Sequence, residues 1–107
     1  MKTPSEKTLE GLKALGDAHR LRILEVLGDG RKCVRDLTDA MGCGQSLVSF
    51  HLRILLEAGL IELVPEGRIH CYAIRSAGLE ELDEELKGLG DRAAAAGPCC
   101  ARVDAPR

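Results

Sequence analysis

The sequence has almost no aromatic residues. Its 107 residues include one Phe, one Tyr and no Trp, although hydrophobic residues make up 45% of the chain. The core must therefore be built from Leu, Ile, Val and Ala, which suit packing between helices better than a β-sandwich. A chain of this length forms about one domain, and dimerisation would add buried surface to so small a core.

Long apolar runs are also absent. No stretch approaches the roughly 18 apolar residues of a membrane helix, and the polar start of the chain lacks a signal-peptide pattern. These absences predict a cytoplasmic protein, in a compartment where thiols are normally kept reduced. Five cysteines in such a chain favour metal or redox chemistry over a disulfide framework.

The net charge of −2 is not the basic balance typical of a protein that coats DNA. The charges are nevertheless unevenly spread. Basic residues gather at Arg20, Arg22, Arg31, Lys32 and Arg35, and acidic residues at Glu80, Glu81, Asp83, Glu84 and Glu85. Charge alone favours solvated helix surface for both clusters. The chain also lacks a phosphate loop and a nucleophile–base set, so we expect no enzymatic activity.

Apolar periodicity, interrupted by glycines, predicts four helices in the first half of the chain. Thr3-Pro4-Ser5-Glu6 is typical of a capping box, and Asp17 is well placed to cap the second helix. The apolar stripes are Leu9, Leu12 and Leu15 in the first helix, Leu21, Leu24 and Leu27 in the second, Leu37 and Met41 in the third, and Val48, Leu52, Leu55 and Leu56 in the fourth. The third helix spans about 34–41, and the fourth spans 45–58 after a tight break at Gly42-Cys43-Gly44.

The pattern then changes to two short strands and a last helix. Segments 60–64 and 69–74 are predicted strands, joined by a turn at Pro65-Glu66-Gly67-Arg68. The last helix has a heptad seam of Leu79, Leu82, Leu86, Leu89, Ala93 and Ala96. This seam packs either on its own domain or on a second copy. We expect a domain over 1–96 and a cysteine-containing tail over 97–107.

This order of elements predicts a winged helix-turn-helix, a mainly α fold with a small β-hairpin. The fourth helix would then read DNA through Gln45, Ser46, Ser49 and Arg53, which leave its apolar face free. Arg68 at the hairpin tip would contact phosphate. The competing interpretation of each is an ordinary solvated surface. Phe50 either packs under the wing or contacts a thymine methyl group.

Three segments together resemble the ArsR-type (arsenic and metal sensor) repressors. They are Asp17-Ala18-His19-Arg20-Leu21-Arg22-Ile23-Leu24, Gln45-Ser46-Leu47-Val48-Ser49-Phe50-His51-Leu52-Arg53 and Glu57-Ala58-Gly59-Leu60-Ile61. The resemblance implies a homodimer joined through the first and last helices, which represses at an imperfect inverted repeat in double-stranded operator DNA until an inducer binds. It also places His51 in or beside the DNA-contacting helix. The alternative is that His51 lies at the core edge, hydrogen-bonded within the domain.

This sequence matches two sensor sites of that family poorly. The zinc-type site across the last helices needs His ligands, and the last helix here has none. The arsenite site has the pattern Cys-Val-Cys-Asp-Leu. The corresponding segment is Cys33-Val34-Arg35-Asp36-Leu37, which keeps the first thiol and replaces the second by Arg.

Cys99 and Cys100 remain, and the resemblance associates a C-terminal cysteine pair with arsenic. Soft thiolates select soft ions, so we expect trivalent arsenic, as arsenite or a methylated arsenical, to be the inducer bound there. The third ligand would be Cys33, Cys43 or Cys71, or would stay with the inducer, although burial is the expected state of Cys71. The alternatives are a thiol-redox or persulfide-responsive repressor that uses the same cysteines, and a protein-interaction domain that binds no DNA.

Overall fold

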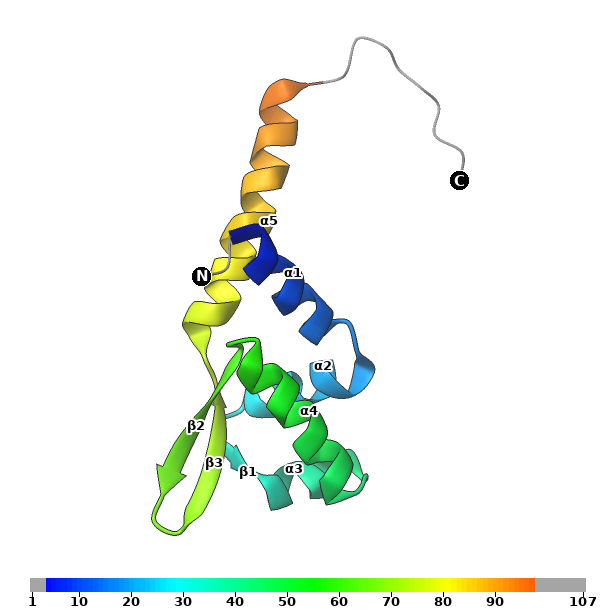
Figure 1. Ribbon diagram of the computed structural model, residues 1–107, viewed down its shortest axis with the longest axis vertical. Helices are drawn as coiled ribbons and strands as arrows, with labels where there is room; N and C mark the ends of the chain where they lie inside the picture. Colours follow the sequence, from blue (N-terminus) through cyan, green and yellow to red (C-terminus); the bar gives the residue numbers. More distant parts are fainter. Residues whose placement is uncertain (1–3, 98–107) are drawn as a thin grey trace.

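The computed structural model describes residues 4–97 of the chain. Thr3 of the predicted capping box lies outside these residues, as do Cys99 and Cys100. The elements in chain order are α1 (Pro4–Leu15), α2 (Ala18–Leu27), β1 (Lys32–Cys33), α3 (Val34–Met41), α4 (Gln45–Glu57), β2 (Ile61–Glu66), β3 (Ile69–Ile74) and α5 (Ser76–Ala96). The fold is mainly helical with a small antiparallel sheet (Figure 1), which confirms the predicted fold class.

The first two helices begin as the sequence predicts. Pro4 is the first residue of α1. Asp17 caps α2, because its Oδ1 accepts hydrogen bonds from the backbone N–H of His19 at 2.8 Å and of Arg20 at 3.3 Å. The buried face of α2 is formed by Ile23 and Leu27. Leu21 of the predicted stripe is 49% exposed. It lies two positions before the buried Ile23, and residues two apart on a helix do not share a face.

Helices α3 and α4 form the helix-turn-helix. Gly42 ends α3 with a φ of +68°, a backbone conformation that favours glycine, and its N–H donates to the carbonyl oxygen of Thr38. Helix α4 turns one face to the core. That core is formed by Ala14, Ile23, Leu27, Leu37, Val48, Leu52, Leu55, Leu60, Ile61 and Leu82.

The wing is a longer hairpin than the sequence predicts. Strand β2 continues through Pro65 to Glu66, whose register partner is Ile69, so the turn contains only Gly67 and Arg68. The predicted turn over Pro65–Arg68 is therefore wrong in its first half. The strand order is β1-β3-β2, which makes β2 an edge strand, and an edge strand tolerates a proline.

Strand β1 was not predicted. It contains only Lys32 and Cys33, and it pairs antiparallel with β3 on the side away from β2. Its register sets Lys32 opposite Tyr72 and Cys33 opposite Cys71. This strand joins the helix-turn-helix to the wing, because α3 begins at the next residue.

Helix α5 packs on the domain only along its first turns. A Cβ atom on Gly78 would lie 2.0 Å from the carbonyl oxygen of Gly59, so this close crossing excludes any side chain. Leu82 is buried against Gly11 of α1. Leu86 and Leu89 are 47% and 58% exposed, and Figure 1 shows α5 continuing past α1 beyond the rest of the domain.

Among the described residues, no helix is long and apolar enough to cross a membrane. The five acidic residues predicted to be solvated on α5 are all exposed, which confirms that prediction: Glu80, Glu81, Asp83, Glu84 and Glu85.

Candidate DNA-binding surface and thiol sites

The exposed face of α4 carries the polar residues predicted to read DNA. Gln45, Ser46, Ser49 and Arg53 are all exposed, whereas Val48 and Leu52 between them enter the core. The N-cap of α4 is Gly44, which offers no side-chain acceptor to the first N–H groups of the helix. These free donors and the positive end of the helix dipole favour a phosphate at this end.

The wing presents a second polar edge. Arg68 is exposed at its tip, next to Gly67, whose φ is +64°. At the level of the same turn, Arg31 Nε lies 2.8 Å from Glu66 Oε2, an ion pair that ties the segment before β1 to the end of β2. Phe50 is 50% exposed on α4, with its ring edge-on to His51 at a centroid distance of 5.1 Å.

His51 lies inside the domain, unlike its polar neighbours on α4. Its residue is only 5% exposed, and Arg20 Nη1 lies 3.1 Å from its Nδ1. Because a guanidinium can only donate, Nδ1 accepts and the proton of the neutral ring is on Nε2, which lies 4.0 Å from Asp17 Oδ1. This arrangement fits the core-edge interpretation of His51 and leaves the ring little surface for a DNA contact.

Arg20 holds three elements together. Its Nε donates to the carbonyl oxygen of Ala14 at 2.6 Å and its Nη2 to that of Lys13 at 3.3 Å, while Nη1 faces His51 of α4. The expectation that this basic cluster is solvated is therefore wrong for Arg20, because its guanidinium satisfies carbonyl groups at the end of α1. Arg22 is exposed and pairs with Glu25 at 3.3 Å, as a solvated residue would.

The pKa values of Asp17 and His51, which lie where α4 meets α1 and α2, are shifted by burial and by neighbouring charges and hydrogen bonds. Burial is the main cause that lowers the pKa of His51, against the attraction of Asp17, and the charge of Arg20 adds to the lowering. Burial alone would raise the pKa of Asp17. The hydrogen bonds from the backbone of Arg20 and His19 outweigh it, so the pKa of Asp17 is lowered.

Asp17, His19 and His51 also bring three potential metal ligands together. Their ligand atoms lie within 4.8 Å of one another, and the two imidazole rings stack at 5.0 Å. Two features oppose a cation there. Asp17 Oδ1 already accepts two backbone N–H groups, and the Arg20 guanidinium lies against the His51 ring. The side chains of Asp17, His19 and His51 therefore hold α4 against the corner between α1 and α2.

The described thiols belong to Cys33, Cys43 and Cys71. Cys71 is buried, as expected for its place in a strand, and burial is the main cause that raises the pKa of its thiol. Cys33 is half-buried, and both its Sγ and its backbone N–H donate to Asp36 Oδ2, at 3.1 and 3.2 Å. The Cys33 hydrogen bonds are the main cause that lowers the pKa of Asp36. Cys43 packs against the core.

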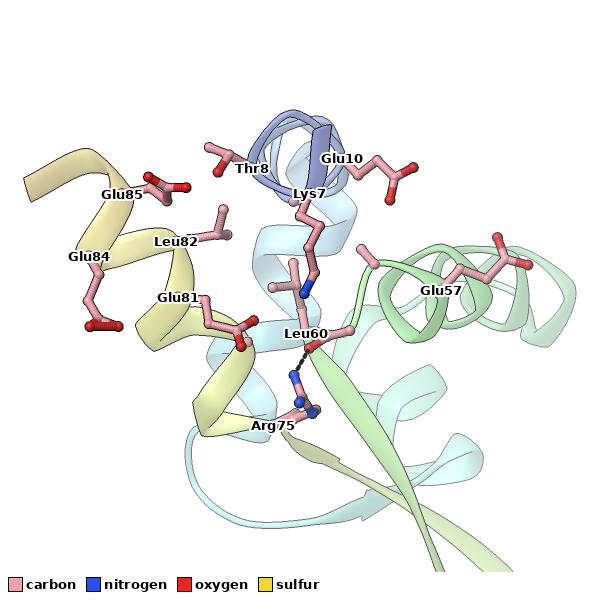
Figure 2. Close-up of a pocket in the computed structure, with 14 residues that line it drawn as sticks. Lys7, Thr8, Glu10, Glu57, Leu60, Arg75, Glu81, Leu82, Glu84 and Glu85 are labelled. Carbon is pink, nitrogen blue, oxygen red and sulfur yellow. Dashed lines mark hydrogen bonds between the residues drawn. The ribbon is translucent and has the colours of Figure 1, made fainter. Parts of the chain in front are cut away.

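An open cleft lies elsewhere, between α1, the end of α4 and the start of α5. It has a volume of about 840 Å³. Figure 2 shows Lys7 and Arg75 pointing into it from opposite sides, while Glu84 points away. Arg75 Nη1 donates to the carbonyl oxygen of Gly59 at 3.2 Å. None of the residues that line the cleft is a cysteine or histidine, so it offers no soft ligand.

The helix-turn-helix, the wing and the exposed polar face of α4 define a winged helix-turn-helix with a surface suited to DNA. Residues 17–62 match the family model described as "Bacterial regulatory protein, arsR family". The arsenical resistance operon repressor of Bacillus subtilis (strain 168) is 41% identical over 78 residues, which cover 72% of this chain and 68% of that protein. The chain belongs to the ArsR family.

Solved structures agree with this family. An ArsR-like transcriptional regulator from Rhodococcus sp. RHA1 superposes with a TM-score of 0.78 at 28% identity, over 86% of this chain and 90% of that one. The solution structure of a homodimeric winged helix-turn-helix domain from Mycobacterium bovis gives a TM-score of 0.68 at 28% identity, over 81% of each chain. Repressors of this family bind DNA and act as homodimers.

Proposed function

We propose that this repressor leaves its operator when trivalent arsenic binds to cysteine thiolates, with Cys99 and Cys100 as the two principal ligands and Cys33 as the candidate third. The observation that carries the proposal is the 41% identity to an arsenical resistance operon repressor in a chain with five cysteines. Soft thiolates are the ligands that suit arsenic. The repressor would act in the cytoplasm, with the tail over 97–107 as its sensor.

The proposed DNA contacts follow from exposure and chemistry. Gln45 can bond adenine bidentately, Arg53 can bond guanine, and Ser46 and Ser49 can bond either bases or phosphate. Arg68 at the wing tip would add a phosphate contact. Because a homodimer is two-fold symmetric, its operator would be an imperfect inverted repeat whose half-sites match the spacing of the two α4 helices.

The proposed dimer interface lies on α1 and α5. Leucines on these helices are exposed in the single chain although leucine side chains favour burial: Leu9, Leu12, Leu86 and Leu89. A second copy would remove them from water, and each fully buried leucine contributes about 2 kcal/mol. Binding of arsenic near the end of α5 would then change the relative placement of the two DNA-reading helices, with a coupling free energy of about 1–3 kcal/mol.

The test is fluorescence anisotropy of the reduced protein on its own upstream DNA, titrated with arsenite and with a trivalent methylarsenical. We expect release by one of them, and no release from the C99S/C100S double variant. The C43S variant is the matched control, because it removes a thiol outside the proposed ligand pair. If arsenic releases the C99S/C100S protein from DNA to the same extent as the wild type, the tail is not the sensor. Release by oxidants alone would instead indicate a redox repressor.

The DNA contacts can be tested in the same assay. Arg53→Ala removes a side chain that is exposed, so the fold should be unchanged, while operator affinity should fall by about 1–3 kcal/mol. Arg22→Ala, an exposed arginine of α2 outside the proposed surface, is the control. Equal losses for both variants would show that charge alone, and not the face of α4, determines binding.

A further inference from the structure

We propose that Cys33 and Cys71 form a second thiol site, which takes a thiophilic ligand needing two thiolates, such as a monosubstituted trivalent arsenical. The choice of arsenic rests on the proposed function, whereas the site itself rests on the geometry of the sheet. Cys33 is the single thiol left at the start of α3, and β3 supplies its partner from the wing.

The pairing of the two strands brings the two side chains together. Cys33 and Cys71 are directly opposite in the antiparallel pair of β1 and β3. Opposite residues in such a pair extend from the same face of the sheet, with Cβ atoms about 4.5–5.5 Å apart. A rotation about each Cα–Cβ bond is then sufficient for both sulfur atoms to reach one bridging atom.

The edge position of β1 gives a ligand access to both thiols. Strand β1 contains only two residues and pairs with β3 alone. Short edge segments with few hydrogen bonds open locally at low free-energy cost. Cys33 is already half-buried rather than buried, so opening of β1 uncovers Cys71 without unfolding the core.

A carboxylate beside Cys33 can accept the proton that the thiol loses when arsenic binds. Cys33 Sγ donates to the Asp36 carboxylate at 3.1 Å, so an acceptor for the thiol proton is in place. With phenylarsine oxide, two As–S bonds replace the As=O bond, and the oxygen leaves as water with the two thiol protons. Arsenic stays trivalent, its third bond is to the phenyl carbon, and no oxidant or third cysteine is required.

A ligand held there would join the two parts of the DNA-binding unit. Cys33 lies immediately before α3, which packs on α4, while Cys71 lies in the central strand of the wing. Bridging the thiols would therefore fix β1 against β3 and constrain the wing relative to the helix-turn-helix.

The experiment uses the full chain with the substitutions C43S/C99S/C100S, which leave Cys33 and Cys71 as the remaining thiols. The reduced protein is treated with phenylarsine oxide and then challenged with an excess of glutathione. Intact mass should show one phenylarsenic group with loss of two hydrogens. Trypsin digestion should give residues 33–35 linked to residues 69–75. Retention against glutathione should exceed that of a single thiol by about 100-fold, as expected for two linked contacts.

The matched control is C71S/C99S/C100S, which also keeps two thiols, those of Cys33 and Cys43. Circular dichroism checks that both proteins are folded, and if C71S protein is not, C33S/C99S/C100S replaces it. Equal retention by the test protein and the folded control, or loss of the adduct from both, overturns the proposal. The outcome is separate from that of the proposed function, because no DNA is present and the tail cysteines are absent.

Discussion

Helices α4 and α5 have similar apolar periodicity, yet they differ in where that periodicity is satisfied. Within its 13 residues α4 buries Val48, His51, Leu52 and Leu55 in its own domain. Helix α5 has 21 residues and buries only Gly78 and Leu82. The difference shows that α4 belongs to the core of the single domain, whereas the outer part of α5 keeps an exposed apolar stripe, which is the proposed dimer interface because burial of such a stripe gains free energy.

The largest effect should come from a cavity beneath α4. Leu55 is fully buried, so Leu55→Ala should reduce the free energy of unfolding by about 2–5 kcal/mol, measured by urea denaturation at several protein concentrations. Leu47→Ala on the same helix is the control, because Leu47 is 39% exposed and its truncation leaves no cavity. Similar losses from both would mean that α4 does not pack as described.

An intermediate effect should come from the outer part of α5. Charge repulsion and the cost of burying carboxylates should make the Leu86→Glu, Leu89→Glu double variant monomeric in sedimentation experiments, with operator affinity lowered by about 100-fold through loss of the second half-site. Leu21→Glu on α2, outside the proposed DNA-binding surface, is the matched control, since Leu21 is 49% exposed and Leu86 47%. A dimer that survives the double substitution would place the interface elsewhere.

The smallest effect is a pH dependence from the buried ring of α4. The pKa of His51 is lowered in the folded state, so the unfolded chain binds more protons as pH falls below about 6.5. Stability is therefore fully present above that pH and is lost as pH falls through the folded pKa. The groups that face the ring are Asp17, His19 and Arg20.

Urea denaturation between pH 8 and pH 5 checks this dependence. His51→Gln should flatten the loss of stability at low pH, because glutamine can accept from Arg20 without titrating. His70→Gln is the control, since His70 is exposed on β3. An unchanged slope in the His51 variant would assign the pH dependence to other groups.

The helices and their caps could be predicted because their signals are local. Asp17 precedes the first turn of α2, and Gly42 ends α3, so short segments of sequence contain all the information needed. The exposed polar face of α4 follows from the same periodicity. The placement of Cys99 and Cys100 stays a prediction, since both lie outside the described residues.

The features that were missed depend on partners far away in the sequence. Two residues cannot be recognised as a strand, so β1 and the Cys33–Cys71 pairing appear only once β3 is in place. Arg20 resembles a solvated helix residue until α1 and α4 bring its acceptors to it. Pro65 favours a turn locally, and only its position on an edge strand allows the extended backbone.

The crossing at Gly78 has a mechanical consequence. Backbone meets backbone there, and the Arg75 side chain bonds the same Gly59 carbonyl group, so the crossing leaves little room for sliding between α5 and the turn that follows α4. Helix α5 is about 30 Å long at 1.5 Å per residue. A shift of about 5 Å at its far end is thus a rotation of about 10° about this pivot, which adjoins the C-terminal end of α4.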